Sequence, residues 1–144
     1  MKNFIVIITL LVSTISNAQE WETNYDQAVA RALESKHNII LVFSGSDWCA
    51  PCIKLDKNIW QSQAFQSYAK ENWVLLRADF PRKKSNKLSE KQMALNAELA
   101  DKYNKNGHFP LVVVLDPSGN VLGETSYKNI SPNEYVALLK EFKS

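Results

Sequence analysis

Cysteine and glycine are scarce in this chain, and charge of one sign is barely in excess. Two cysteines in 144 residues allow one disulfide at most, which excludes a small secreted scaffold held by several bridges. Four glycines and five prolines exclude collagen-like and low-complexity chains. The 17 basic and 15 acidic residues leave a net charge of +2, too balanced for a protein that grips nucleic acid through phosphate contacts. These absences leave a single globular domain.

No apolar run is long enough to span a bilayer, which takes about 20 residues. The run from Phe4 to Val12 follows a basic residue and precedes small polar residues that end at Ala18. This order is typical of an export signal cleaved after Ala18. We therefore expect residues 1–18 to be a signal peptide, and residues 19–144 to work in the periplasm or as a secreted domain, without stable membrane insertion. A retained anchor or a buried strand is the alternative.

Apolar periodicity divides the rest of the chain into strands and helices. Continuous runs of β-branched and apolar residues predict strands buried on both faces, whereas apolar residues three and four apart predict helices. The expected strands span residues 21–24, 38–43, 73–79, 111–115 and 121–127. The expected helices span residues 26–35, 49–60, 62–72, 89–104 and 132–142. In the second helix, Ile53, Ile59 and Trp60 are available for the core.

The order of these elements predicts the fold class. From residue 38 onward it is β-α-β-α-β-β-α, which implies an α/β fold with right-handed crossovers and helices on both faces of a central sheet. A turn at residues 117–120 joins the last two strands as a hairpin, so the sheet is expected to be mixed.

Cys49 and Cys52 carry the chemistry expected of this chain. They stand in Trp48-Cys49-Ala50-Pro51-Cys52, after a buried strand and at the start of a helix. The free N–H groups and the positive end of the helix dipole stabilise an anion there, so we expect a low pKa for the Cys49 thiol. Cys52, about one turn further on, could resolve a mixed disulfide formed at Cys49. The spacing alone also occurs in zinc sites and inert bridges; the strand-to-helix placement favours redox chemistry.

The chain resembles exported thioredoxin-like proteins of the thioredoxin superfamily in this segment and in Gly107-His108-Phe109-Pro110. The resemblance covers nearly all of residues 19–144 and implies a thioredoxin-like fold. In that family the proline before the next strand is cis and lies against the cysteine pair, which implies a cis Phe109–Pro110 bond. It also implies that substrate pairs with the backbone of Phe109, with Trp48, Pro51 and Pro110 as further substrate contacts.

Three departures from the family pattern bear on mechanism. Cytosolic thioredoxins carry a buried acid six positions before the first cysteine, where this chain has Phe43, so the proton acceptor for Cys52 is missing or supplied differently. Ala50 replaces a glycine in the middle pair, although Pro51 still resembles the reducing members. Residues 81–88 are longer and more basic than a minimal thioredoxin connection, and they could dock an acidic partner or form a solvated loop.

Metal and cofactor binding fit the sequence poorly. A zinc site needs two more ligands near the cysteines, and the only histidines are His37 and His108. Haem attachment needs a histidine directly after Cys52, where Ile53 stands. We expect no cofactor. His108 could tune the site, although an exposed loop histidine is the simpler interpretation, and Asp47 could raise the pKa of the Cys49 thiol if the two are close.

The sequence therefore predicts a thiol–disulfide oxidoreductase that reduces protein disulfides outside the cytoplasm, with Cys49 as nucleophile and Cys52 as resolving thiol. Its expected partners are protein disulfide substrates and a membrane-bound thiol electron donor, without nucleic acid. An oxidase, an isomerase and a non-catalytic binding or chaperone module stay open, because direction depends on a reduction potential that the sequence does not fix. Any dimer would be non-covalent, since both cysteines are assigned to the site.

Overall fold

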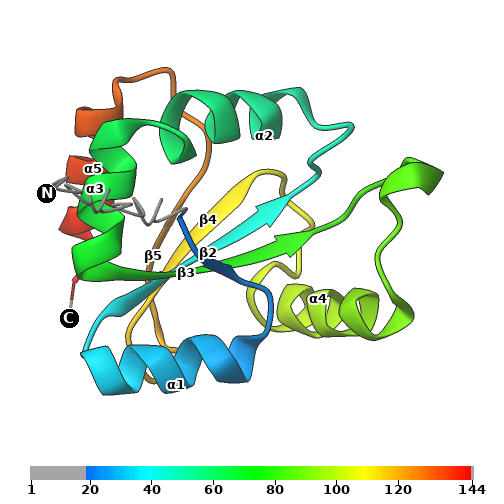
Figure 1. The fold of residues 1–144 in the computed structure, drawn as a ribbon, viewed down its shortest axis with the longest axis horizontal. Coiled ribbons are helices and arrows are strands. Elements are labelled where there is room, and N and C mark those ends of the chain that lie inside the picture. Colours follow the sequence, from blue (N-terminus) through cyan, green and yellow to red (C-terminus); the bar gives the residue numbers. More distant parts are fainter. Residues whose placement is uncertain (1–18, 144) are drawn as a thin grey trace, which may run out of the picture.

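The computed structural model describes residues 19–143, which form a five-stranded sheet in the order β1-β3-β2-β4-β5 (Figure 1). The strands are β1 (Trp21–Glu22), β2 (Asn38–Ser44), β3 (Trp73–Asp79), β4 (Leu111–Leu115) and β5 (Val121–Thr125). β1, β3 and β2 run parallel, β4 is antiparallel to β2, and β5 is antiparallel to β4. The predicted mixed sheet and its terminal hairpin are thus confirmed. The predicted signal peptide lies outside the described residues.

The helices also follow the predicted order. They are α1 (Tyr25–Ser35), α2 (Ala50–Leu55), the π-helical turn η1 (Asp56–Trp60), α3 (Gln63–Asn72), the 3₁₀ turn η2 (Lys84–Asn86), α4 (Glu90–Tyr103) and α5 (Pro132–Glu141). Two predicted strand ends were wrong by two residues. The first strand stops early because Asn24 caps α1, and the last ends at Thr125. The helix predicted over residues 49–60 is α2 continued by η1, with Cys49 as its N-cap.

Helices cover both faces of the sheet, as predicted: α1 and α4 lie on one side and α2, α3 and α5 on the other (Figure 1). Successive strand residues point to opposite faces. In β2, Ile40 and Val42 pack in the core beneath α2, α3 and α5. Ile39, Leu41 and Phe43 pack in the core beneath α1 and α4. This alternation decides which strand residues reach the cysteine pair.

The core assignment in the second helix was right for two residues and wrong for one. Ile59 is fully buried and Trp60 is 2% exposed, whereas Ile53 is 47% exposed. Cys52 and Leu55 face the sheet, so the residue directly after Cys52 turns toward solvent. Trp60 is the centre of an aromatic cluster with Trp21, Phe65 and Tyr135, whose ring centroids lie 5.8, 4.6 and 5.6 Å away. This cluster anchors the far end of the α2–η1 helical run.

Within residues 19–143, every helix is too short or too polar to cross a bilayer.

Candidate active site

The cysteine pair lies where β2 ends and α2 begins. Cys49 has extended backbone geometry at the N-cap of α2, and its sulfur accepts the N–H of Cys52 at 3.4 Å. The two cysteines form a disulfide with a Cα–Cα distance of 5.2 Å. The backbone N–H of Gly45 donates to the Cys52 sulfur at 3.5 Å. Cys49 and Cys52 are 5% and 3% exposed, so the disulfide lies just beneath the surface, against backbone donors.

The turn between β2 and α2 is fastened to the end of the neighbouring strand. The N–H and hydroxyl of Ser46 donate to the carboxylate of Asp79 at 2.9 and 2.5 Å. The N–H of Cys49 donates to the carbonyl of Gly45 at 2.9 Å. These bonds hold the first cysteine in place relative to the sheet before any substrate arrives.

Three aromatic side chains and one arginine form a wall beside the cysteines. Trp48 and Phe109 meet edge-to-face with ring centroids 5.4 Å apart, and Phe109 meets Phe80 at 5.5 Å. The indole N–H of Trp48 donates to the carbonyl of Phe80 at 2.7 Å. The Arg82 guanidinium lies 3.6 Å from the centre of the Trp48 ring, a cation–π distance. Two predicted substrate contacts, Trp48 and Phe109, are therefore brought together.

The segment before β4 places Pro110 behind the cysteines. The Phe109–Pro110 peptide bond is cis, as expected, and Pro110 is buried in the wall of a cavity that Cys52 also lines. Asn104 holds this segment, since its side-chain amide donates to the carbonyl of His108 and its side-chain oxygen accepts the N–H of His108, both at 2.9 Å. His108 is exposed, which agrees with a loop histidine.

A second pair of bonds holds Pro110 from the other side. The Ser126 hydroxyl donates to the carbonyl of Pro110 at 2.5 Å, and the Tyr135 hydroxyl donates to the carbonyl of Ser126 at 2.8 Å. Burial raises the pKa of Tyr135, so its hydroxyl stays protonated and able to donate. Pro51, the remaining predicted contact, is exposed in the first turn of α2.

The basic segment at residues 81–88 is bound to the active-site turn by Asp47. Its carboxylate accepts the N–H of Arg82 at 2.9 Å, the N–H of Lys83 at 3.0 Å and the side-chain amide of Asn86 at 3.0 Å. These hydrogen bonds lower the pKa of the Asp47 carboxyl, and the bond from the N–H of Arg82 has the largest effect. The carboxylate thus faces the basic segment, and it fixes that segment against the site.

A cavity of about 100 Å³ lies on the inner side of Cys52. The β2 residues in its wall are Val42 and Ser44, whereas Phe43 packs on the opposite face of the sheet. Phe43, the position compared with the buried acid of cytosolic thioredoxins, therefore does not line this cavity. Val42 is apolar and Ser44 carries a neutral hydroxyl, so β2 supplies no carboxylate to the cavity.

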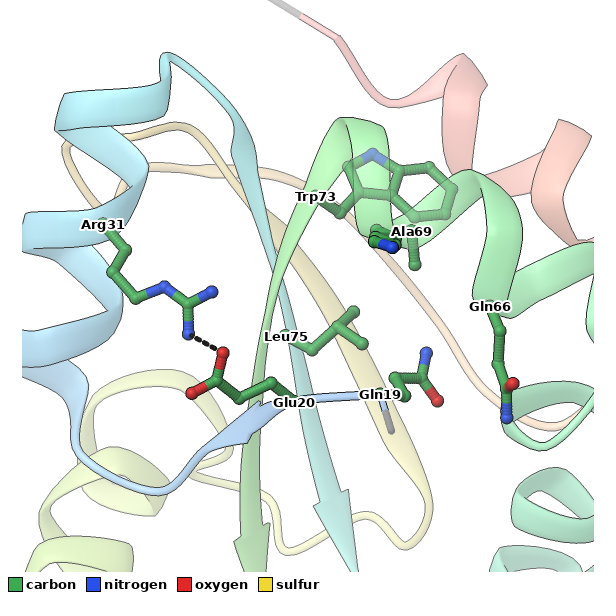
Figure 2. Close-up of a pocket in the computed structure, with 8 residues that line it drawn as sticks. Gln19, Glu20, Arg31, Gln66, Ala69, Trp73 and Leu75 are labelled. Carbon is green, nitrogen blue, oxygen red and sulfur yellow. Dashed lines mark ion pairs between the residues drawn. The ribbon is translucent and has the colours of Figure 1, made fainter. Parts of the chain in front are cut away.

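Another cavity, of about 250 Å³, is lined by the residues just before β1 and by residues of α1, α3 and β3 (Figure 2). Its Arg31 and Glu20 form an ion pair at 3.2 Å whose side chains are 44% and 74% exposed. Neither cysteine lines this cavity, so we place the chemistry at the smaller one.

No group of three or more His, Cys, Asp or Glu side chains suited to hold a metal occurs in the described part of the chain.

A family model described as thioredoxin-like matches residues 20–117. The chain belongs to the thioredoxin-like family. It is 34% identical over 121 residues, covering 84% of this chain and 70% of the relative, to the disulfide bond reductase DsbH of Chlamydia pneumoniae. A solved structure of a DsbH oxidoreductase superposes with a TM-score of 0.80 at 30% identity, covering 97% of this chain and 93% of that one.

A thioredoxin from Thermus thermophilus shares the fold at a TM-score of 0.62 and 16% identity, with 84% of each chain covered. With its redox-active cysteine pair, this thioredoxin-like protein is a thiol–disulfide oxidoreductase.

Among the residues of the site that sequence reasoning missed are Gly45, Asp56, Arg77, Phe80 and Arg82. Arg77 did carry a signal, because it is the one charged residue inside the apolar run from Trp73 to Ala78. A lone charge in a buried strand needs a partner, which for Arg77 is Asp56. The other contacts depend on how separate segments approach one another, and no local pattern gives that.

Proposed function

We propose that this protein reduces disulfides in other proteins, with Cys49 as the attacking thiolate and Cys52 as the resolving thiol. The observation that carries the proposal is the placement of Cys49 at the N-cap of α2, with Cys52 one turn further in and against the sheet. A relative named disulfide bond reductase, 34% identical to this chain, supports the direction.

The first step uses the N-terminal end of the helix. In the reduced protein, the N–H of Cys52 and the positive end of the helix dipole stabilise a Cys49 thiolate. The thiolate attacks one sulfur of the substrate disulfide, forming a bond to it, and the electron pair of the broken S–S bond leaves on the other sulfur as a thiolate. The product is a mixed disulfide between Cys49 and the substrate.

The second step regenerates the disulfide described above. Cys52 loses its proton, and its thiolate attacks the sulfur of Cys49. The bond between Cys49 and the substrate breaks, and the substrate leaves with the electron pair as its second thiolate. One substrate disulfide is reduced and the Cys49–Cys52 dithiol is oxidised, so two electrons must later be returned to the protein.

The substrate lies against the aromatic wall in this proposal. An extended segment pairs with the backbone of Phe109, and its side chains contact Trp48, Pro51 and Pro110. The half-exposed Ile53 at the edge of α2 adds apolar surface at the same place. This arrangement suits a flexible protein segment that carries a cysteine, because backbone pairing is independent of sequence.

We place the protein outside the cytoplasm, on the basis of the signal-like residues 1–18. In an oxidising compartment a reductase needs a continuous electron supply. The donor we propose is a membrane-bound dithiol that reduces the Cys49–Cys52 disulfide by the reverse of the same exchange chemistry.

Trapping experiments test the proposal. In Cys52→Ser the mixed disulfide has no resolving thiol, so covalent complexes with client proteins should accumulate in the native compartment and disappear on treatment with a reductant. Cys49→Ser is the matched control and should trap none, because it lacks the nucleophile. Equal trapping by both variants, or persistence of insulin-reducing activity in Cys49→Ser, would overturn the assigned roles.

A further inference from the structure

The cavity behind Cys52 contains one acid and one base. Asp56 and Arg77 are the only charged side chains among its lining residues, and Asp56 Oδ1 lies 3.1 Å from Arg77 Nη2. The side-chain amide of Gln61 donates to Asp56 Oδ2 at 2.6 Å. The buried Nε of Arg77 has no hydrogen-bond partner among residues 19–143. Buried polar groups are normally satisfied by protein or by water, so this is a place suited to water.

Helix geometry brings Asp56 to the same side as Cys52. The two residues are four positions apart, and the N–H of Asp56 donates to the carbonyl of Cys52, so their side chains lie on one face of the helical run. Asp56 is also the first residue of the π-helical turn η1, a feature common near functional sites. Arg77 approaches from β3, where it pairs in register with Val42.

The second step of the reaction needs a proton acceptor at this place. A cysteine thiol has an ordinary pKa of about 8.5, so roughly 3% of it is thiolate at pH 7, and burial lowers that fraction further. Cys52 is 3% exposed, and the β2 residues that line its cavity, Val42 and Ser44, carry no carboxylate. The only carboxylate in the wall of the Cys52 cavity comes from the helix.

We propose that Asp56 accepts the proton of the Cys52 thiol through water in this cavity, while Arg77 positions the Asp56 carboxylate. A cavity of about 100 Å³ has room for several water molecules, since one needs about 10–15 Å³ by this measure. The S–H bond of Cys52 breaks, the proton reaches Asp56, and the thiolate attacks the Cys49 sulfur as described above. Asp56 then returns the proton to solvent. The inference rests on the proposed roles of Cys49 and Cys52.

A two-step reaction with a chromogenic disulfide separates this inference from the proposed function. Reduced protein reacts with 5,5′-dithiobis(2-nitrobenzoate) by releasing one coloured thiolate when Cys49 attacks and a second when Cys52 resolves the adduct. Stopped-flow absorbance gives both rates between pH 5 and 9. We expect Asp56→Asn to slow the second release at least fivefold at pH 7, to leave the first within twofold, and to approach wild type at pH 9, where the thiol ionises unaided.

Companion variants keep the test independent of folding. Asp101→Asn, an exposed acid on α4, is the matched control and should change neither rate. Asp56→Glu, which restores a carboxylate, should recover most of the lost rate. Arg77→Met should slow the second release without abolishing it, because the carboxylate remains.

The unchanged first release shows that a slow variant is folded. A second release in Asp56→Asn that is slowed less than fivefold, or is faster, overturns the inference, since the carboxylate would then act at most by repelling the thiolate. Loss of the fast first release in Cys49→Ser, with at most one slow release from the buried Cys52 thiol, would still support the proposed function in that case.

Discussion

Gly45→Ala is predicted to destabilise the protein because a Cβ at Gly45 would collide with the Trp48 ring. A Cβ added at Gly45 would lie 2.5 Å from Cζ2 and 2.6 Å from Nε1 of the Trp48 ring, so Gly45→Ala must displace the indole. Displacement removes the hydrogen bond to the carbonyl of Phe80, the edge contact with Phe109 and the stacking of Arg82.

The size of the effect follows from these contacts. A neutral hydrogen bond contributes about 0.5–1.5 kcal/mol, an aromatic pair about 0.5–1.5 kcal/mol, and an exposed cation–π contact about 0.5–1 kcal/mol. Because the displaced ring retains part of its contact area, we expect Gly45→Ala to destabilise the protein by about 2–3 kcal/mol. Urea unfolding of the oxidised protein measures this as a lower midpoint at an unchanged slope.

A double-mutant cycle isolates the cause. In Trp48→Ala there is no ring to displace, and Gly45 has no left-handed backbone to preserve, since the positive-φ glycines are Gly107 and Gly119. Adding Gly45→Ala to Trp48→Ala should then be neutral or stabilising by up to about 1 kcal/mol, because alanine restricts the unfolded chain. The predicted coupling is about 2–3 kcal/mol. An equal cost of Gly45→Ala in both backgrounds would refute the reasoning.

Three other substitutions test separate parts of the structure. Hydrogen bonds lower the pKa of Asp47 in the folded protein, so its stabilising effect is full above about pH 5 and is lost as pH falls through the folded-state value. The difference in unfolding free energy between wild type and Asp47→Asn should therefore be constant above about pH 5 and should shrink steadily as pH falls from there toward about pH 3; a pH-independent difference would contradict this. Tyr135→Phe removes the 2.8 Å bond to the carbonyl of Ser126 and should cost about 1 kcal/mol in urea unfolding; no measurable loss would show that the bond does not stabilise the Pro110 segment. Phe65→Ala empties a fully buried position and should cost about 3–5 kcal/mol by the same measurement, whereas a cost under about 1.5 kcal/mol would mean that the core repacks.

Much of the fold could be predicted because its central strands carry strong local signals. β2, β3 and β4 are apolar runs bounded by polar residues, and burial on both faces requires that composition. The order of elements then limited the topology to a mixed sheet with helices on both sides. The side of α2 that meets the sheet could not be predicted in the same way. Ile53 was assigned to the core because it is apolar, but the apolar character of one residue does not show which side of a six-residue helix is buried.

The site could be predicted only in part, for the same physical reason. The spacing of Cys49 and Cys52 identified them as the reactive pair, and the cis bond before Pro110 followed from the family resemblance. The pair of Asp56 and Arg77 is separated by 21 positions and forms because the register of β3 against β2 brings Arg77 beneath the turn where α2 becomes η1. Register and helix phase are tertiary properties, so the sequence alone did not show that Phe43 packs on the face of the sheet away from the Cys52 cavity.

The equilibrium reduction potential of the Cys49–Cys52 pair tests the central claim most directly. The oxidised and reduced forms are equilibrated with a series of glutathione ratios, thiols are blocked by alkylation, and the fraction reduced is read by mass. The account predicts a potential more negative than about −240 mV, nearer the value of about −270 mV typical of thioredoxin, so that the dithiol donates electrons to protein disulfides. A potential between about −180 and −120 mV, the range of isomerases and oxidases, would contradict it.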